Sequence, residues 1–330
     1  MNKNKTNPLH PKIRYSFFKI PTGSDLSKRR LPIMSADSGN PGPVVWLTAC
    51  SHGDEVGGVV IIQEIFKKIR RERNLIKGAI FAFPLMNPIG FETASRHITL
   101  SKEDLNRSFP GNKDGSLGER IADIIFTTIL KTNPRIVLDL HNDWIKSMPY
   151  ALIDPDRDPK LSDVNRTSDL FASTTGLLVV RDTEEIHNSL CVNLHKHNIA
   201  ALTLELGEPN IINEKNVEYG VRSIEKILQY LEMVKPVNEL FQYQIPDMYK
   251  GKILKYFAKP QSTTSGIIRF LVKPGDIVKK DQTLCKIYNT FGRLQKTLTA
   301  LHDGIVLGHC DSCVAFPGMP VLAFGIEQLT

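Results

Sequence analysis

The sequence lacks the features that mark secreted, membrane-spanning and disulfide-stabilised proteins. Its five cysteines are an odd number without a regular spacing, and a chain of 330 residues can fold without cross-links. Residues 1–6 are polar, and no apolar leader follows them. No run approaches the roughly 18 apolar residues that a membrane-spanning helix needs. We therefore expect a cytoplasmic protein in a reducing compartment, with no membrane partner.

The sequence also lacks a concentrated basic surface. Lysine and arginine outnumber aspartate and glutamate by 42 to 35, which gives a formal net charge of +7. The basic residues are scattered, apart from short groups at 28–30 and 67–71, and no long basic stripe is interleaved with aromatic residues. The composition therefore argues against nucleic-acid binding. A scattered excess is typical of a solvated surface, although positive charge in a cleft would attract an anionic substrate.

Apolar stretches typical of strands alternate with segments of helical spacing up to about residue 235. The predicted strands are residues 44–48, 78–83, 136–140, 177–181 and 200–205. The predicted helices are residues 57–71, 117–131, 187–198 and 216–233. This alternation indicates an α/β fold, with a mainly parallel sheet flanked by helices. Ligands of such sheets bind beyond the carboxyl ends of the strands.

After Pro236 the pattern changes to short strand-like pieces separated by turn signals, without a convincing helix. We therefore predict two domains, a catalytic domain over 1–240 and a small all-β domain over 245–330. Residues 266–284 resemble the first half of a biotinyl/lipoyl-type hammerhead domain, which carries its cofactor on a lysine at a hairpin tip. The corresponding stretch, 288–293, has no lysine in the expected setting. A structural or site-covering role is favoured over a carrier role.

Four polar residues stand at or just past the ends of predicted strands. His52 and Glu55 are three residues apart, between a strand and a helix, while His141 and Glu205 end two further strands. Two histidines and one carboxylate form a catalytic zinc site with a position open for water, and a separate glutamate can act as base. The pattern predicts a zinc hydrolase. The alternatives are a chance His-x-x-Glu pair at a helix start and a buried Glu205 neutralised by an arginine.

A second unusual feature is the polar loop around residues 87–96 and 104–111. Asn106 and Arg107 lie in a stretch bounded by proline and glycine, where a purely structural protein has little need for them. A guanidinium group next to an amide can bind a carboxylate through directed donors. The loop therefore predicts a substrate-binding element.

Taken in order, these motifs resemble the succinylglutamate desuccinylase/aspartoacylase family, a branch of the zinc carboxypeptidase-like fold. The resemblance spans about residues 44–210, and the appended β-domain also fits the family layout. The matching positions are His52-x-x-Glu55, Asn87-Pro88, Arg96, residues 104–111, His141 and Glu205.

The resemblance implies a role for each of these side chains. Three residues would ligate one Zn²⁺ ion per chain: His52, Glu55 and His141. Glu205 would take a proton from the zinc-bound water and deliver it to the leaving amine. Arg96 would polarise the scissile carbonyl, and Asn106 and Arg107 would hold a carboxylate or another acceptor group of the substrate. The implied reaction hydrolyses the amide bond of a small N-acyl amino acid or a related acylated amine.

Several neighbouring residues leave alternatives open. Asp139 would support His141 if both side chains point the same way along their strand, but an ordinary strand-end carboxylate is equally consistent. Arg181, at another strand end, is a candidate for gripping a dicarboxylic substrate, at a spacing that does not match the expected one. The lone pair Cys310 and Cys313 indicates neither a structural zinc site nor a redox site.

Two other functions remain open at this stage. The same zinc site would serve a metallocarboxypeptidase acting on peptides, and a non-catalytic binding module could retain the fold without the chemistry. The small β-domain also offers a second surface on which a homo-oligomer could form.

Overall fold

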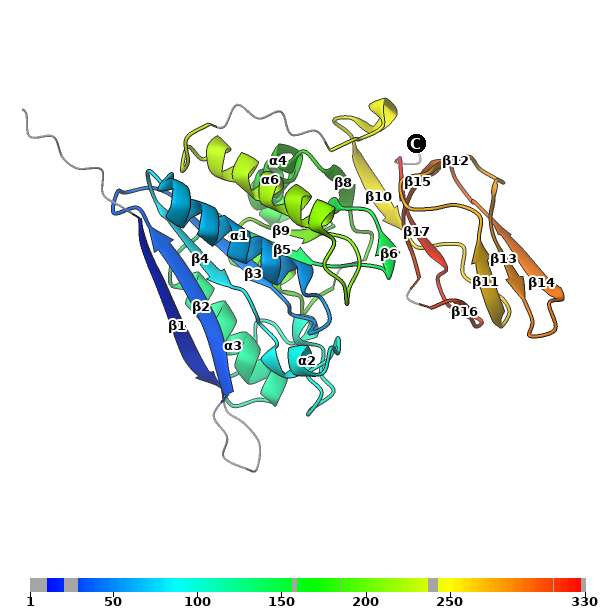
Figure 1. Cartoon of the computed structure of the whole chain (residues 1–330), viewed down its shortest axis with the longest axis horizontal. Helices are drawn as coiled ribbons and strands as arrows, with labels where there is room; N and C mark the ends of the chain where they lie inside the picture. Colours follow the sequence, from blue (N-terminus) through cyan, green and yellow to red (C-terminus); the bar gives the residue numbers. More distant parts are fainter. Residues whose placement is uncertain are drawn as a thin grey trace, which may run out of the picture.

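The computed structural model describes residues 11–20, 29–155, 159–184, 186–236, 243–310 and 312–327. In this part of the chain, helices flank one mixed sheet of 13 strands, and a second sheet of four strands lies at the far end from α1 and α6 (Figure 1). The predicted α/β fold with a mixed sheet is confirmed.

Four parallel strands form the centre of the main sheet, in the order β4, β3, β5, β9. Their bounds are Ala79–Phe83 (β4), Val44–Ala49 (β3), Ile136–His141 (β5) and Ala201–Glu205 (β9). All four were predicted within a residue or two. Their valines, isoleucines and leucines are buried between two helical layers, as is usual for parallel strands. Their carboxyl ends meet at one edge of the sheet.

The strands on either side are mostly antiparallel to this centre, so the sheet is less parallel than predicted. β1 (Lys12–Ile20) and β2 (Arg29–Asp37) form an antiparallel edge, and β7 (Tyr150–Ile153) runs antiparallel to β9. The sequence analysis missed these three strands. β8 (Leu178–Arg181), which was predicted, pairs in parallel with β7.

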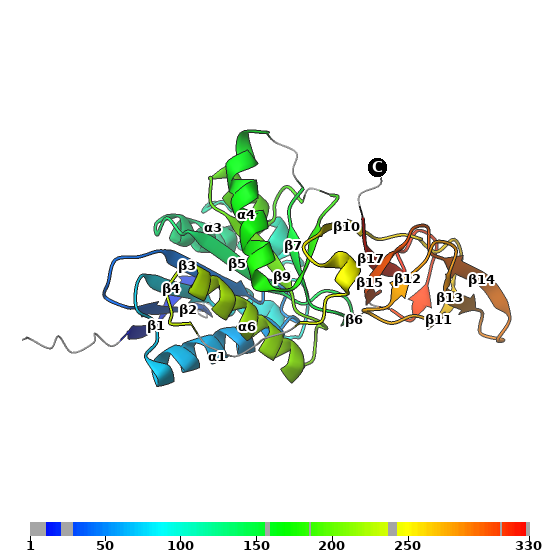
Figure 2. The same ribbon diagram turned by 90° about the horizontal axis from the view of Figure 1, so that it is seen from above.

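Helices cover both faces of the sheet. One face carries α1 (Gly57–Glu72), α4 (Ser162–Thr175) and α6 (Glu214–Tyr230), whose apolar sides share one core. The other carries α2 (Pro88–Glu92), α3 (Leu117–Leu130) and α5 (Leu190–Lys196) over a second core. α1 and α6 lie side by side beneath the sheet in Figure 2, with α3 on the opposite side. Three short 3-10 helices connect these elements: η1 (Leu105–Arg107), η2 (Pro159–Leu161) and η3 (Asp247–Tyr249).

The described C-terminal segment is built of strands, with η3 as its one helical turn. β10 (Ile253–Phe257) pairs in parallel with β8, so the main sheet continues from the helix-flanked part of the chain into this segment. The strands that follow β10 in this sheet are β17 (Leu322–Ile326), β15 (Gly304–His309) and β12 (Ile277–Val278), and β6 (Lys146–Ser147) pairs with β15. The four-stranded sheet consists of β11 (Gly266–Phe270), β13 (Thr283–Tyr288), β14 (Leu294–Thr299) and β16 (Val314–Ala315).

Among the described residues, no helix combines the length and the apolar composition that crossing a lipid bilayer would require.

Candidate active site

A tight loop between β3 and α1 carries His52 and Glu55. The backbone N–H of Glu55 donates to the carbonyl oxygen of His52 at 3.2 Å, which bends the chain before α1 begins at Gly57. A Cβ atom on Gly53 would lie only 2.0 Å from the backbone carbonyl carbon of Gly90, so glycine is required at this close approach. The loop turns the side chains of His52 and Glu55 toward one point.

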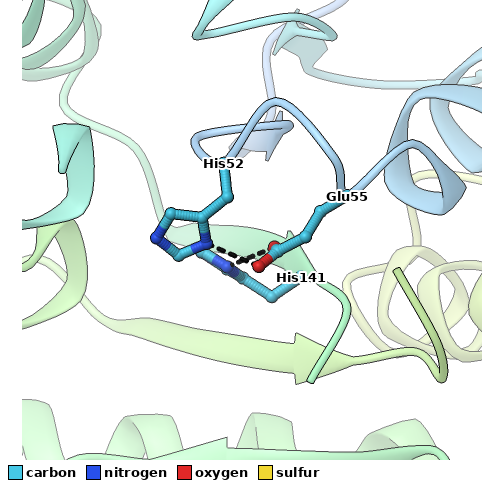
Figure 3. Close-up of side chains that lie close together, drawn as sticks. All are labelled: His52, Glu55 and His141. Carbon is cyan, nitrogen blue, oxygen red and sulfur yellow. Dashed lines mark hydrogen bonds and ion pairs between the residues drawn. The ribbon is translucent and has the colours of Figure 1, made fainter. Parts of the chain in front are cut away.

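The structure brings His52, Glu55 and His141 together, as Figure 3 shows. His141 ends β5, the neighbour of β3 in the sheet. The Nδ1 atom of His52 lies 2.5 Å from Oε1 of Glu55, and the Nδ1 atom of His141 lies 2.8 Å from Oε2. One donor atom from each residue lies within 4.8 Å of the others, and all three side chains are buried. Two imidazoles and a carboxylate at this separation fit Zn²⁺.

The second nitrogen of each histidine faces another carboxylate. Nε2 of His52 lies 3.1 Å from Oδ1 of Asp104, and Nε2 of His141 lies 2.9 Å from Oδ2 of Asp139. Histidines that bind metals usually donate their other N–H in this way, which fixes the ring and leaves Nδ1 for the metal. Of the two roles left open for Asp139, the support of His141 is the one observed.

The site favours positive charge between its carboxylates. Burial alone would raise the pKa of Glu55, but His52 and His141 outweigh it and hold the pKa below its ordinary value. Burial alone would lower the pKa of His141, but Asp139 and Glu55 raise it well above its ordinary value. The pKa of His52 is also raised, because Glu55 and Asp104 outweigh its burial. A bound metal ion would take the place of these protons.

Arg96 reaches the edge of the same cluster. Its Nη2 atom donates to Oδ2 of Asp104 at 3.2 Å, and its Nη1 atom lies 3.7 Å from Oε1 of Glu55. The side chain is 44% exposed. Its guanidinium therefore lies beside the clustered His52 and Glu55 side chains and remains partly exposed to the solvent.

Asn106 and Arg107 follow Asp104 in the turn η1. The Asp104 carboxylate fixes this turn by accepting the backbone N–H of Asn106 at 2.8 Å. Oδ1 of Asn106 accepts the backbone N–H of Leu190 at 3.0 Å, which anchors the turn to α5. The Arg107 guanidinium donates to the Asn106 carbonyl oxygen at 3.0 Å, and the side chain is exposed.

Glu205 ends β9 and is the register partner of His141 on β5. Its Oε2 atom is inaccessible to solvent and has no hydrogen-bond partner among the described residues. Burial raises the pKa of Glu205 well above its ordinary value, and nearby Asp143 raises it further, while His141 opposes the shift. The described part of the chain contains no arginine paired with Glu205, so the arginine-neutralised alternative is not what the structure has.

A cavity of about 770 Å³ joins these elements. All seven side chains that the sequence predicts for the site line it: His52, Glu55, Arg96, Asn106, Arg107, His141 and Glu205. Thr203 of β9 and Leu152 of β7, which are register partners, also line the cavity.

Part of the cavity wall was not predicted from the sequence. The C-terminal segment contributes six residues: Tyr256, Phe257, Ala258, Lys259, Gln261 and Pro320. Asp154 and Asp182 also line the cavity, each directly after a strand. A signal for Asp182 was present, because a polar residue follows the predicted strand 177–181. No comparable signal marks the C-terminal residues, whose position depends on the pairing of β10 with β8.

Two further candidates stand outside the site. Arg181 does not line the cavity, because its guanidinium pairs with Asp169 of α4 at 2.7 Å and donates to a backbone carbonyl oxygen. Cys310 is buried and Cys313 is exposed, and neither forms a disulfide within the described residues. Among the described residues, only the His52, Glu55 and His141 group meets the geometry of a metal site.

Residues 41–231 match a family model described as the succinylglutamate desuccinylase/aspartoacylase catalytic domain. A curated relative from Halomonas elongata, N-alpha-acetyl-L-2,4-diaminobutyric acid deacetylase, is 27% identical over 290 residues. That alignment covers 84% of this chain and 80% of the relative.

Two solved structures share the fold over nearly their whole length. One is a succinylglutamate desuccinylase from Silicibacter sp. TM1040, with a TM-score of 0.82 and 19% identity, covering 99% of this chain and 100% of that one. The other is the product-bound ectoine utilization protein EutE (DoeB) from Ruegeria pomeroyi, with a TM-score of 0.81 and 20% identity, covering 98% and 100%. Because the matched catalytic domain takes up more than half of the sequence, the chain belongs to the succinylglutamate desuccinylase/aspartoacylase family.

Proposed function

We propose that this chain is a zinc-dependent hydrolase that cleaves the amide bond of a small N-acyl amino acid or a related acylated amine. One observation carries the proposal: donor atoms of His52, Glu55 and His141 lie within 4.8 Å of one another, in a cavity that also holds Glu205 and Arg96. Family membership and the deacetylase name of the Halomonas relative support an amide as the bond that is cleaved.

In this proposal the three clustered residues hold a single Zn²⁺ ion. When bound there, the ion would act as a Lewis acid, which lowers the pKa of a water ligand to about 7. Carboxylates behind each ring, Asp104 and Asp139, orient the histidines so that one nitrogen of each faces Glu55.

Glu205 is the proposed general base. A carboxylate with a raised pKa and a free oxygen atom is suited to accept a proton near neutral pH. It would take a proton from the attacking water and pass it to the amine nitrogen as the C–N bond breaks. Water is consumed, and a carboxylic acid and a free amine are released.

The polar loop would bind and polarise the substrate. Arg96, beside Glu55, is positioned to donate to the amide oxygen as negative charge develops on it. The anchored turn holds Arg107 and the amide N–H groups of Asn106 as donors for a substrate carboxylate.

For the C-terminal segment we propose a site-covering role. Its residues Tyr256, Lys259 and Pro320 line the cavity, and Tyr256 accepts a hydrogen bond from the Trp144 indole N–H at 3.0 Å. Residues 289–293, the turn between β13 and β14, contain no lysine to which a cofactor could be attached. The hammerhead resemblance therefore supports a structural element and not a carrier.

The decisive experiment is a metal assay on the purified protein combined with turnover of a panel of N-acyl amino acids and C-terminally free peptides. The proposal expects about one zinc per chain and release of acid and amine from a member of the first group. Zinc with turnover of peptides alone would establish the metallocarboxypeptidase instead. Absence of zinc after reconstitution would overturn the ligand assignment and leave a binding module.

A further inference from the structure

The floor of the cavity is one face of the neighbouring strands β9 and β7. Glu205 lies opposite Tyr150 in the register of these strands, and Thr203 lies opposite Leu152. All four residues line the cavity. Because alternate residues of a strand share a face, the row on β7 continues from Leu152 to Asp154, which also lines the cavity. The cavity thus runs from the catalytic end, past a threonine and a leucine, to a carboxylate.

Asp182 stands next to Asp154 at this end. β7 and β8 are parallel, Ile153 is the register partner of Arg181, and the backbone N–H of Asp182 donates to the Ile153 carbonyl oxygen at 2.9 Å. The two aspartates therefore follow the ends of adjacent parallel strands.

Asp182 brings negative charge to this end of the cavity, within electrostatic reach of the Arg107 guanidinium. Its Oδ1 atom accepts the backbone N–H groups of Thr183 and Glu184, and it forms no ion pair within the described residues. Burial raises the pKa of its carboxyl, and the nearby Asp154 and Glu184 raise it further. The negative potential at this end of the cavity therefore favours the binding of a cation.

A buried histidine supports the Asp154 carboxylate from behind. Nδ1 of His195 lies 3.2 Å from Oδ2 of Asp154, and its Nε2 atom lies 3.0 Å from the Ser168 hydroxyl oxygen. His195 and Ser168 are both buried, whereas the Asp154 side chain is 22% exposed. Oδ2 of Asp154 has no hydrogen-bond partner among the described residues, so this carboxylate retains the capacity to accept from a cationic group.

Arg181, the candidate for gripping a dicarboxylic substrate, does not reach this wall. The Arg181 guanidinium is paired with Asp169 and bonds the backbone carbonyl oxygen of Asp154, outside the cavity. This part of the cavity wall therefore presents the carboxylates of Asp154 and Asp182. The guanidinium of Arg181, which could select a dicarboxylic acid, is not there. An acidic side chain would meet the carboxylates of Asp154 and Asp182 here, and this repulsion costs affinity.

We propose that Asp154 and Asp182 bind a positively charged amino group on the substrate side chain, so that the chain deacylates an N-acylated diamino acid. The inference rests on the proposed function, because it assigns the far end of the same cavity. Leu152 and Thr203 would contact the methylene groups between the reacting amide and the side-chain ammonium. His195 is a positioning residue that acts through Asp154.

The test compares acetate release from matched substrates by the zinc-loaded protein. Acetate is the readout because cationic substrates already carry a free amine. The cationic series is the Nα-acetyl derivatives of 2,4-diaminobutyrate, ornithine and lysine. The neutral series is those of 2-aminobutyrate, norvaline and norleucine, and the acidic series is N-acetylaspartate and N-acetylglutamate. We expect kcat/KM for the best cationic substrate to exceed that of its neutral counterpart by about 100-fold.

Substitutions locate the preference within the cavity. Asp154→Asn and Asp182→Asn should each reduce the cationic-to-neutral ratio by about tenfold or more, whereas Asp182→Glu should retain most of it. The ratio is measured within one preparation, so a loss of folded protein does not affect it. Asp163→Asn, which removes the same charge from an exposed position on α4, should leave the ratio unchanged.

The possible failures are distinguishable. No acetate from any series would reject the proposed deacylase itself. Hydrolysis of neutral or acidic substrates at rates equal to or above the cationic ones would overturn the cation-binding role and leave the deacylase intact. An unchanged ratio in both asparagine variants would likewise remove Asp154 and Asp182 from substrate selection.

Discussion

Oδ2 of Asp139 lies 2.9 Å from Nε2 of His141, on the far edge of the ring from the Nδ1 atom that contacts Glu55. The two residues share a face of β5 because they are two positions apart on a strand. The Thr48 hydroxyl donates to the other oxygen of Asp139 at 2.7 Å, which fixes the carboxylate in turn. The orientation of His141 is therefore set from the interior of the sheet, before any metal binds.

Asp139→Asn should weaken zinc binding. The amide carries no charge, so it supports the His141 ring less strongly and leaves its Nδ1 atom a poorer donor. Loss of such a supporting carboxylate lowers metal affinity by about 10–100-fold. Competition with a chromogenic chelator measures this affinity directly.

The matched control is Asp163→Asn, which removes one exposed carboxylate from the first turn of α4 and should bind zinc as the wild-type protein does. Thermal unfolding of both variants checks that each is folded. Equal zinc affinity in Asp139→Asn and the wild type would show that Asp139 does not support a metal ligand.

Glu205→Gln should separate metal binding from turnover. The amide keeps the shape of the side chain but cannot accept the proton, so kcat should fall by about 10²–10⁴-fold. The zinc content should stay at the wild-type level, because Glu205 is not among the clustered ligands. Since the substitution removes a buried carboxylate whose Oε2 has no partner, thermal stability should be equal or higher. A kcat equal to that of the wild type would reject the assigned base.

The central strands were predicted from the sequence, and His52, His141 and Glu205 were predicted as site residues because they stand at or just past strand ends. His52, His141 and Glu205 come from three strands that are adjacent and parallel, so their carboxyl ends meet. The hydrophobic runs of such buried strands are strong local signals. The convergence of these side chains therefore follows from strand order, although they are far apart in the chain.

The parts of the cavity wall that were not predicted depend on the pairing of strands, and this pairing leaves no local pattern in the sequence. β7 is four residues long and runs antiparallel to β9, which places Asp154 and not another strand end at the far side of the cavity. Arg181 was a candidate for gripping a dicarboxylic substrate, but its guanidinium pairs with the Asp169 carboxylate on α4, and the next residue, Asp182, lines the cavity instead. A shift of one residue along a strand end reverses the charge that a substrate meets.

Removal of the metal should abolish activity and lower stability together. A ligand that binds only the folded state stabilises that state by mass action. Zinc at about 100 times its Kd should therefore add about 2.7 kcal/mol to the free energy of unfolding. Treatment with a chelator should lower Tm by a few degrees and stop turnover, and added Zn²⁺ should restore both. His52→Ala should show neither the zinc-dependent rise in Tm nor the recovery of activity. A wild-type Tm that does not respond to zinc would contradict the cluster as a metal site.

His309 should make the stability of the C-terminal segment depend on pH. Its ring stacks on Phe270 with centroids 3.9 Å apart, and its Nε2 atom donates to the Val272 carbonyl oxygen at 2.8 Å. Burial lowers the pKa of His309, and Lys146 lowers it further, against the opposing effects of Val272 and Asp276. The ordinary pKa of a histidine is 6.5. Below that pH, the His309 ring binds a proton in the unfolded chain more readily than in the folded chain.

Stability should therefore be unaffected by His309 above about pH 6.5 and should fall as the pH drops below it. His309→Gln cannot titrate, so its Tm should decrease less than that of the wild type between about pH 7.5 and about pH 5.5. His97→Gln, at an exposed position, should retain the wild-type slope. Differential scanning calorimetry of the three proteins gives the comparison. If His309→Gln loses as much stability in acid as the wild type, the neutral ring of His309 does not contribute to the pH dependence of folding.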